Sequence, residues 1–471
     1  MKKNQQAPKT PPATPAMASR AIAFDVLQNV LRKRQPFDES LEHHPALGQL
    51  AKRDRGFVHA LVAVTLRRLG QIDDVVKSCL DKPETLKAAA QDLLRLGAAQ
   101  LLFLGTPAHA AVDTIVELAG SDNATAPYKG LINAVLRRLT REGAALIAKQ
   151  DAEKLNTPAW LWLSWRQTYG VGKARELAAA NQAEALTDIS VKADAADWAA
   201  RLQAKLLPTG SLRLQEGRET PTDVEEASGL QSAPPPDLPR EGGGIRSGIT
   251  ALAGFAEGAW WVQDAAASLP VLLLGNVRGQ RVIDLCAAPG GKTAQLAARG
   301  AEVVAVDRSD KRLGRLRDNL ARLRLEAEII VSDALKYLPD AKAPFVLLDA
   351  PCSATGTIRR HPDVPHLKTQ EDVMRMAALQ AALLNHAVRN LLVSGGVLVY
   401  AVCSLQPEET RAQIEAMLKS WPQLRRRPVK PEEIGGEAGF ITTEGDIRCL
   451  PCQWPDHGGI DGFYAARLVL S

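Results

Sequence analysis

The chain lacks a disulfide framework and any long hydrophobic run. Its 471 residues include only six cysteines, at irregular spacing. Thiols this sparse indicate a reducing compartment and not a secreted protein. No stretch reaches about 18 uninterrupted apolar residues, and the N-terminus has no apolar segment of the kind found in signal peptides. We therefore expect a soluble, cytoplasmic protein without a membrane partner.

A strong charge of one sign is also missing. The formal net charge is +5, which is too small to indicate a polyanionic partner by itself. Basic residues nevertheless cluster in the N-terminal third of the chain. The clusters are Arg32-Lys33-Arg34, Lys52-Arg53 with Arg55, Arg67-Arg68, and Arg137-Arg138. Their concentration in one part of the chain favours an RNA-facing surface over ordinary solvated helix faces.

The N-terminal part of the chain carries helical periodicity. Strand-like alternation is almost absent before about residue 185, whereas apolar residues recur at helical spacing from Ser19 onward. We predict a disordered tail over residues 1–18, and an all-helical domain over 19–145. A linking module over 146–253 follows. Its low-complexity stretch, 208–248, is predicted to be a disordered insertion.

The C-terminal part changes to an alternation of strand-like runs and amphipathic helices, from about residue 254. The candidate strands are Arg281–Leu285, Glu302–Val306, Glu328–Val331, Phe345–Leu348 and Val397–Ala401. This alternation predicts an α/β domain over 254–471 with a doubly wound, largely parallel sheet. Ligands of such sheets bind at the carboxyl ends of the strands.

The first strand of this domain ends in a glycine-containing loop, Asp284-Leu-Cys286-Ala-Ala-Pro-Gly290-Gly291-Lys-Thr293. Two glycines between a strand and a helix let a ligand approach the backbone beside the positive end of the helix dipole. A Walker A loop is excluded because its first glycine position holds Cys286. A dinucleotide fingerprint is excluded because it needs three glycines at fixed spacing. The loop therefore fits a smaller, less phosphorylated ligand.

Acidic residues end the next two candidate strands. Asp307 stands roughly 20 residues after the loop, where a carboxylate can accept hydrogen bonds from ribose hydroxyls. Asp333 ends the third strand, where it can receive an adenine amino group. This series, with no phosphate-binding lysine loop, points to S-adenosylmethionine rather than to NAD or ATP.

Two cysteines follow two of the strand candidates. Cys352 follows Phe345–Leu348 through Asp349-Ala-Pro, and Cys403 directly follows the run Val399-Tyr-Ala-Val. If the two strands are parallel neighbours, both thiols face one pocket. A methyltransferase that acts on carbon 5 of a pyrimidine needs such a thiolate, because its addition at carbon 6 makes carbon 5 nucleophilic. Asp349 is suited to hydrogen-bond N3 of that ring. The residues alone leave open which thiol attacks.

Three motifs resemble the RNA (cytosine-5-)-methyltransferase family. They are Asp284–Thr293, the run Asp349-Ala-Pro-Cys-Ser-Ala-Thr-Gly-Thr-Ile-Arg-Arg-His-Pro-Asp363, and Tyr400-Ala-Val-Cys-Ser404. The segments 111–119 and 130–138 are similar to the closing helices of a NusB-like RNA-binding domain. The combination resembles the bacterial branch of the family that methylates one cytosine of 16S ribosomal RNA.

This resemblance implies a NusB-like helical domain followed by a Rossmann-like class I methyltransferase domain, with S-adenosylmethionine as the methyl donor. It implies Cys403 as the nucleophile and Cys352 as the residue that helps to release the methylated RNA. Asp349, which is suited to N3 of the base, is the third candidate catalytic residue. The residues that it assigns to the methyl-donor site are Cys286, Ala287, Ala288, Pro289, Gly290, Gly291, Lys292, Asp307, Asp333 and Asp349. We expect 16S ribosomal RNA as the partner of a monomeric enzyme.

Two other functions stay open at this point. The same chemistry on transfer RNA fits the catalytic motifs, and only the helical domain favours the ribosomal substrate. A non-catalytic RNA-binding factor built on the NusB-like domain predicts a decayed cofactor loop or missing thiols, but both are intact. The pair Cys449-x-x-Cys452 lacks a second pair of ligands at the spacing of a zinc site, so we expect no metal.

Overall fold

The computed structural model describes residues 14–215 and 248–471. Most of the predicted tail and most of the predicted insertion therefore lie outside the described residues. The chain divides into two compact units. The first holds the described residues up to Pro158 together with His361–Leu367, and the second holds the remaining described residues. The division falls inside the predicted linking module, 146–253.

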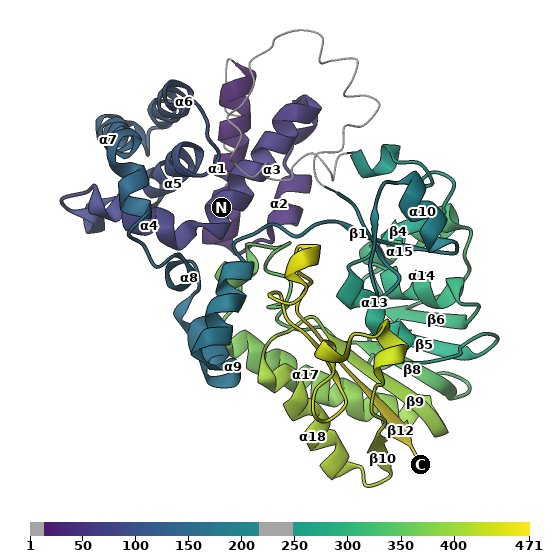
Figure 1. The fold of residues 1–471 in the computed structure, drawn as a ribbon. Helices are drawn as coiled ribbons and strands as arrows, with labels where there is room; N and C mark the ends of the chain where they lie inside the picture. Colours follow the sequence, from purple (N-terminus) through teal and green to yellow (C-terminus); the bar gives the residue numbers. More distant parts are fainter. Residues whose placement is uncertain (1–13, 216–247) are drawn as a thin grey trace, which may run out of the picture. The chain divides into compact units, whose positions relative to one another are not determined.

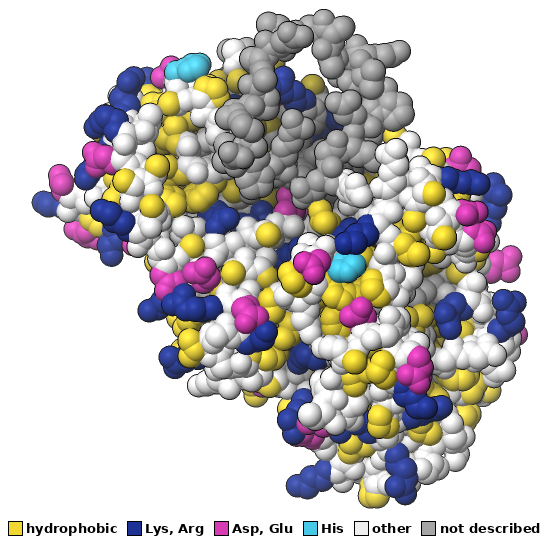
Figure 2. Space-filling view, in the orientation of Figure 1, with side chains coloured by type: hydrophobic (Ala, Val, Ile, Leu, Met, Phe, Trp, Pro, Cys, Tyr) yellow, Lys and Arg dark blue, Asp and Glu magenta, His cyan; other side chains and the backbone are white. Residues whose placement is uncertain are grey.

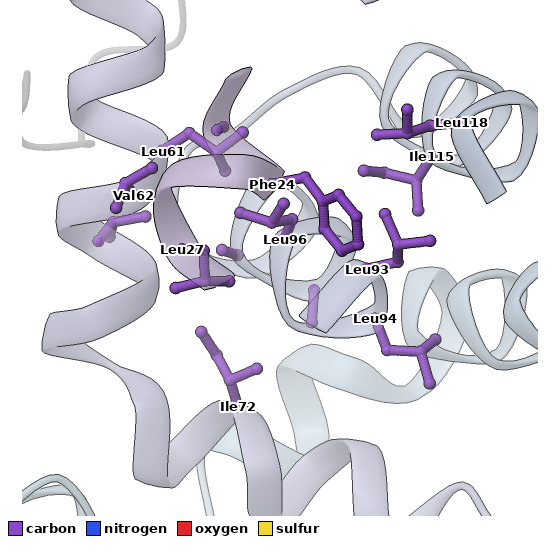
Figure 3. Close-up of a cluster of buried hydrophobic side chains, with 14 of the residues drawn as sticks. Phe24, Leu27, Leu61, Val62, Ile72, Leu93, Leu94, Leu96, Ile115 and Leu118 are labelled. Carbon is purple, nitrogen blue, oxygen red and sulfur yellow. The ribbon is translucent and has the colours of Figure 1, made fainter. Parts of the chain in front are cut away.

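The first unit is helical, as the sequence predicted (Figure 1). Its helices are α1 (Pro15–Lys33), α2 (Phe37–Glu42), α3 (Lys52–Arg67), α4 (Leu69–Ser78), α5 (Ala88–Leu102), α6 (Ala108–Gly120), α7 (Lys129–Ile147), α8 (Ala152–Leu155) and α16 (Val364–Leu367). The apolar faces of α1 to α7 meet in one core, and Figure 3 shows Phe24, Leu61, Leu93 and Ile115 within it. Burying each such side chain contributes about 1.5–3 kcal/mol. The apolar residues that recur at helical spacing are therefore the ones that the helices bury in this core.

Helix α1 begins earlier than the sequence predicted. Residues up to 18 were expected to be disordered, but the helix starts at Pro15, and Met17 is buried in the core. The side chain of Thr14 accepts a hydrogen bond from the backbone N of Met17 at 3.3 Å, and proline suits the first helical position because it needs no donor there. The last residues of the predicted tail are therefore a capped helix start.

A short segment from far along the chain belongs to the helical unit. The Asp363 carboxylate accepts a hydrogen bond from the backbone N of Phe37 at 2.9 Å. The ring of His366 hydrogen-bonds the carbonyl oxygen of Leu66, also at 2.9 Å. Part of the motif that contains Cys352 is thus built into the first unit.

The second unit is built on a mixed sheet with the strand order β10-β12-β9-β8-β5-β6-β7, in which β11 also pairs with β12. The strands are β5 (Arg281–Leu285), β6 (Glu302–Asp307), β7 (Glu328–Val331), β8 (Ala343–Asp349), β9 (Leu392–Val402), β10 (Leu424–Arg426), β11 (Ile447–Cys449) and β12 (Phe463–Leu470). Strands β9, β8, β5, β6 and β7 run parallel, whereas β12 is antiparallel to β9. The predicted parallel sheet is confirmed.

Helices cover both faces of this sheet (Figure 1). The further helices of the second unit are α9 (Ala159–Ala180), α10 (Ala195–Arg201), α13 (Ala265–Leu272), α14 (Gly291–Ala298), α15 (Asp310–Leu323), α17 (Gln370–His386) and α18 (Arg411–Ser420). Along β8, Val346 and Leu348 pack in the cluster that contains α17 and α18, whereas Leu347 packs in the cluster that contains α13. Successive side chains point to opposite faces, so a strand covered on both faces is apolar throughout.

A small antiparallel sheet, β2-β3-β1-β4, also belongs to the second unit. Its strands are β1 (Asp188–Val191), β2 (Lys205–Leu206), β3 (Leu212–Arg213) and β4 (Trp260–Val262). Strand β3 corrects the expectation that disorder begins at residue 208. Arg213 is buried and pairs with both carboxylate oxygens of Asp188, at 2.6 and 2.7 Å. This ion pair fixes the start of the stretch, and residues 216–247 of the predicted insertion lie outside the described residues.

Within the two described ranges, no helix is both long and apolar enough to cross a membrane.

Candidate active site

The loop between β5 and α14 is shaped for a close approach of the backbone. Gly290 has a φ of 106° and immediately precedes α14. A Cβ atom at this position would lie 2.7 Å from Cγ of Leu316. Only glycine fits both the positive φ and the contact. Gly290 therefore lets the loop pack closely against Leu316 of α15 at the start of α14.

A cavity of about 610 Å³ lies beside this loop. The predicted donor-site residues that line it are Ala287, Pro289, Gly290, Gly291, Lys292 and Asp349. Other lining residues come from α15 and from the segment around β4, and they include Arg315, Asn319, Val262 and Asp264. The carboxyl end of the parallel sheet thus carries a hollow of the size that suits a small ligand.

Asp284 also lines this cavity, although the sequence analysis did not assign it a role. One carboxylate oxygen accepts a hydrogen bond from the Thr293 hydroxyl at 2.6 Å. The other, Oδ1, has no hydrogen-bond partner among the described residues. Burial raises the pKa of Asp284 to about 7, because a low dielectric disfavours the charged form. The sequence feature that could have identified Asp284 is its place at the end of β5, directly before the glycine loop.

Four of the predicted donor-site residues do not line the cavity. Asp307 is buried at the end of β6, where it pairs with Arg312 at 2.8 Å and accepts a hydrogen bond from the backbone N of Ala288 at 3.2 Å. Asp333 is exposed after β7, and its carboxylate accepts a hydrogen bond from the backbone N of Leu335 at 3.0 Å. Cys286 lies in the loop with a φ of 60°, and burial raises the pKa of its thiol to about 12. Asp307 thus supports the loop through its hydrogen bond to Ala288. Asp333 does not line the cavity.

The two cysteines that follow β8 and β9 lie side by side. These strands are parallel neighbours, with Asp349 opposite Ala401. Beyond them, the backbone N of Gly356 donates a hydrogen bond to the carbonyl oxygen of Cys403 at 3.0 Å. The Sγ atoms of Cys352 and Cys403 are 3.5 Å apart. The sequence predicted that both thiols face one place, and the structure brings them together.

Asp349 forms an ion pair next to these thiols. Its Oδ2 lies 2.7 Å from Nζ of Lys292, whose ammonium also lies over the ring of Phe463 at 5.2 Å. Burial disfavours the charged ammonium, but the charge of Asp349 and the hydrogen bond to it outweigh this effect and raise the pKa of Lys292. Lys292 therefore stays cationic at neutral pH and holds the Asp349 carboxylate at the rim of the cavity.

The serine that follows each cysteine is buried and bonded to Glu409, which the sequence analysis did not single out. Glu409 is fully buried and accepts hydrogen bonds from the Ser404 hydroxyl at 2.5 Å, from the Ser353 hydroxyl, and from the backbone N of Ser353 at 2.8 Å. The only signal was a carboxylate shortly after the second cysteine, in the run Pro407-Glu-Glu.

A buried charge network joins the Asp349–Asp363 run to two other segments of the second unit. The Arg360 guanidinium contacts Asp264 at 2.6 Å and Asp461 at 2.7 Å. Burial raises the pKa of Asp461 to about 6, and the nearby charge of Arg360 opposes the shift. The network ties the wall of the cavity to the segment that precedes β12.

The predicted basic clusters differ in exposure. Residues 32–34, 52–53 and 137–138 are exposed, and Figure 2 shows Lys and Arg side chains of the helical unit interspersed with acidic ones. Arg67 is buried, so the cluster Arg67-Arg68 does not form a free basic surface. The case for an RNA-facing surface on this unit therefore depends on the other clusters.

Cys449 is buried at the end of β11, and Cys452 follows it three residues later. Across residues 14–215 and 248–471, no group of three or more His, Cys, Asp and Glu side chains is arranged to hold a metal ion.

Parallel strands β9-β8-β5-β6-β7 beside the antiparallel β12, with a glycine loop after β5, are the arrangement of the Rossmann-like methyltransferase class. Comparison with known proteins agrees. The model of the family described as 16S rRNA methyltransferase RsmB/F matches residues 271–469, and the model of the NusB family matches residues 17–141.

Among related proteins, ribosomal RNA small subunit methyltransferase B of Pseudomonas putida is 37% identical, with 96% of this chain and 98% of the relative covered. The protein of the same name from Vibrio cholerae is 34% identical, with 96% and 97% covered. The chain belongs to the 16S rRNA methyltransferase RsmB/F family.

Two solved structures share the fold. The crystal structure of PH0851 has a TM-score of 0.69 at 23% identity, with 98% of this chain and all of the other covered. That of NSun6 from Pyrococcus horikoshii has a TM-score of 0.51 at 22% identity, with 66% and 98% covered.

Proposed function

We propose that this enzyme transfers a methyl group from S-adenosylmethionine to carbon 5 of a cytosine in 16S ribosomal RNA, through a covalent bond between Cys403 and carbon 6 of the base. The observation that carries the proposal is the 3.5 Å approach of the Cys352 and Cys403 sulfur atoms at the carboxyl edge of the sheet. A carbon-5 methyltransferase needs a thiol at this place, whereas a methyltransferase that acts on a nitrogen atom does not.

The cavity beside the glycine loop suits the methyl donor. Asp284 offers the unpartnered oxygen Oδ1 to a cationic group of a ligand. Gly290 and Gly291 line the cavity at the positive end of α14, where the donor's carboxylate fits. We propose that these residues, with Lys292 and Asp349, hold S-adenosylmethionine. Bound there, it supplies an electrophilic methyl group.

The thiols divide the chemistry between them. The Cys403 thiolate adds to carbon 6 of the cytosine, and the resulting electron-rich carbon 5 accepts the methyl group. The cationic Lys292 ammonium, held by Asp349, offsets the negative charge that develops on the ring. Asp349 accepts a hydrogen bond from N3 once that atom takes up a proton. A solvent molecule then takes the carbon-5 proton, and the electrons of that bond expel the Cys403 sulfur and restore the aromatic ring.

Cys352 suits the release step better than the attack. Its hydrogen bond with Cys403 and its burial raise the pKa of Cys352 well above the ordinary value. It therefore stays a neutral thiol at neutral pH, next to the sulfur atom that must leave the base. A neutral thiol there can protonate the departing sulfur.

The test uses both cysteines. Cys403→Ala should abolish methyl transfer, because no thiolate adds to the base, while binding of S-adenosylmethionine survives. Cys352→Ala should trap an RNA–protein adduct that resists denaturing electrophoresis. A fully active Cys403→Ala protein, measured with tritiated S-adenosylmethionine, would overturn the assignment of the nucleophile.

The ribosomal substrate is proposed from the NusB-family domain and from the relatives, which are named for the small-subunit RNA. Bisulfite sequencing of RNA from cells with and without the gene should show one protected cytosine in 16S ribosomal RNA that disappears with the gene. Loss of protection in transfer RNA instead would favour the other substrate.

A further inference from the structure

One buried carboxylate connects the two cysteine-bearing turns. Glu409 lies in a short 3-10 turn, Pro407–Glu409, and is fully buried. It contacts Ser353, the neighbour of Cys352, and Ser404, the neighbour of Cys403. A residue from a third segment thus bonds directly to both turns.

The hydrogen bonds around Glu409 restrict how the two serine side chains can turn. Each serine hydroxyl has one proton, and both protons point to Oε2 of Glu409. The Ser404 oxygen in turn accepts from the backbone N of Gln406 at 3.1 Å. The other carboxylate oxygen, Oε1, accepts from the backbone N of Ser353 at 2.8 Å. Backbone and side chain of one turn, and the side chain of the other, are therefore fixed to the same group.

Glu409 is itself held at its carboxylate and at its backbone. Nε2 of Gln380 donates to Oε1 of Glu409 at 3.2 Å and to the carbonyl oxygen of Pro351 at 2.8 Å, one residue before Cys352. The Tyr400 hydroxyl donates to the backbone carbonyl of Glu409 at 2.7 Å. These donors are neutral, and burial raises the pKa of Glu409. Packing alone would be served better by an apolar side chain, since a carboxylate buried without a cation costs free energy.

We propose that Glu409 is a positioning residue, which holds Ser353 and Ser404 so that the thiols of Cys352 and Cys403 stay within reach of each other. Its catalytic consequence rests on the proposed function: Cys352 can act on the bond that Cys403 forms only while the two turns keep this spacing. Glu409 does not line the cavity, so it does not act through binding of the methyl donor.

The first measurement needs neither RNA nor methyl donor. The full-length protein is equilibrated with mixtures of reduced and oxidised glutathione, and the Cys352–Cys403 disulfide is quantified by alkylation and peptide mass spectrometry. The two thiols give up two protons and two electrons, and one oxidised glutathione becomes two reduced ones. The glutathione ratio at half-oxidation reports the effective concentration of one thiol at the other.

Glu409→Gln should lower this effective concentration by about tenfold, because loosened turns sample wider spacings. The matched control is Glu408→Gln. Glu408 lies in the same turn, but its carboxylate accepts from Gln370 at 2.8 Å, so the control should match the wild type. An unchanged effective concentration in Glu409→Gln overturns the proposal.

The second measurement separates this proposal from the proposed function. In Glu409→Gln, kcat for methylation should fall by about tenfold while KM for S-adenosylmethionine stays the same. If the wild type forms no methylcytosine but the disulfide equilibrium still shifts, the proposed function fails and the positioning role stands. If the wild type methylates and Glu409→Gln equals it in both measurements, the positioning role fails.

Where Glu409→Gln does not fold, as judged by its tryptophan fluorescence, Ser404→Ala serves instead. It removes one donor to Glu409 and keeps the carboxylate, and it should lower the effective concentration in the same direction. A wild-type value for Ser404→Ala then overturns the proposal.

Discussion

Replacing Asp284 by asparagine should change how stability depends on pH. Burial raises the pKa of Asp284 from its ordinary value of 3.8 to about 7. The folded protein therefore binds this proton more tightly than the unfolded chain. The contribution to the free energy of unfolding is full below about pH 4 and is lost as the pH rises through about 7.

The size of the effect follows from the gap between the two pKa values. The gap between 3.8 and about 7 corresponds to roughly 4 kcal/mol of unfolding free energy in total, at about 1.4 kcal/mol per pKa step. Between about pH 5 and pH 8 the expected loss is roughly 2.5 kcal/mol. Asparagine has no proton to release and can still accept from Thr293, so this loss should be missing from the variant.

Urea unfolding followed by tryptophan fluorescence measures the loss of unfolding free energy in the second unit, which contains Asp284. All eight tryptophans lie at or after position 160, in the second unit. Asp318→Asn is the control, because Asp318 is an exposed carboxylate at the same cavity and should keep the wild-type slope. If the wild-type and Asp284→Asn curves stay parallel between about pH 5 and pH 8, the folded protein does not protonate Asp284, and the reasoning is wrong.

Two further substitutions test the structure directly. Gly290→Ala should destabilise the second unit by about 2 kcal/mol and weaken donor binding, because its Cβ would meet Leu316. Gly436→Ala, at a φ of 87° with open space around it, should show only the smaller backbone strain; equal losses in the two variants would contradict the steric reasoning. Arg213→Met should cost about 3–5 kcal/mol, since it leaves the buried Asp188 carboxylate without its cation. Thermal unfolding measures it, and a change below about 1 kcal/mol would show that this ion pair does not hold β3.

Much of the sheet was predictable because its strands are short apolar runs that alternate with amphipathic helices. β5 and β7 match their predicted bounds. Strand β9 begins at Leu392, five residues before the predicted Val397. The glycine pair at 395–396 hid its start, because glycine is rare inside strands and reads as a turn.

The meeting of the two thiols was predictable for a different reason. Cys403 directly follows β9 and Cys352 follows the end of β8 by three residues, and parallel neighbours place such ends at one edge. Glu409 was not predictable, since nothing in Pro407-Glu-Glu distinguishes the buried carboxylate from its neighbour Glu408. The burial of Asp284 depends in the same way on what packs above the end of β5, and a single sequence does not contain that information.

The position of β12 in the sheet has a consequence for synthesis. This strand contains almost the last residues of the chain, yet it lies between β9 and β10 and pairs with both. Just before it, the backbone N of Gly462 donates a hydrogen bond to the carbonyl oxygen of Gly356 at 2.8 Å, and the backbone N of Gly356 in turn donates to Cys403. A growing chain leaves the ribosome N-terminus first, so most of the helical unit can fold early. The sheet is incomplete until β12 has been made, and a chain that stops before Phe463 should be unable to form the second unit.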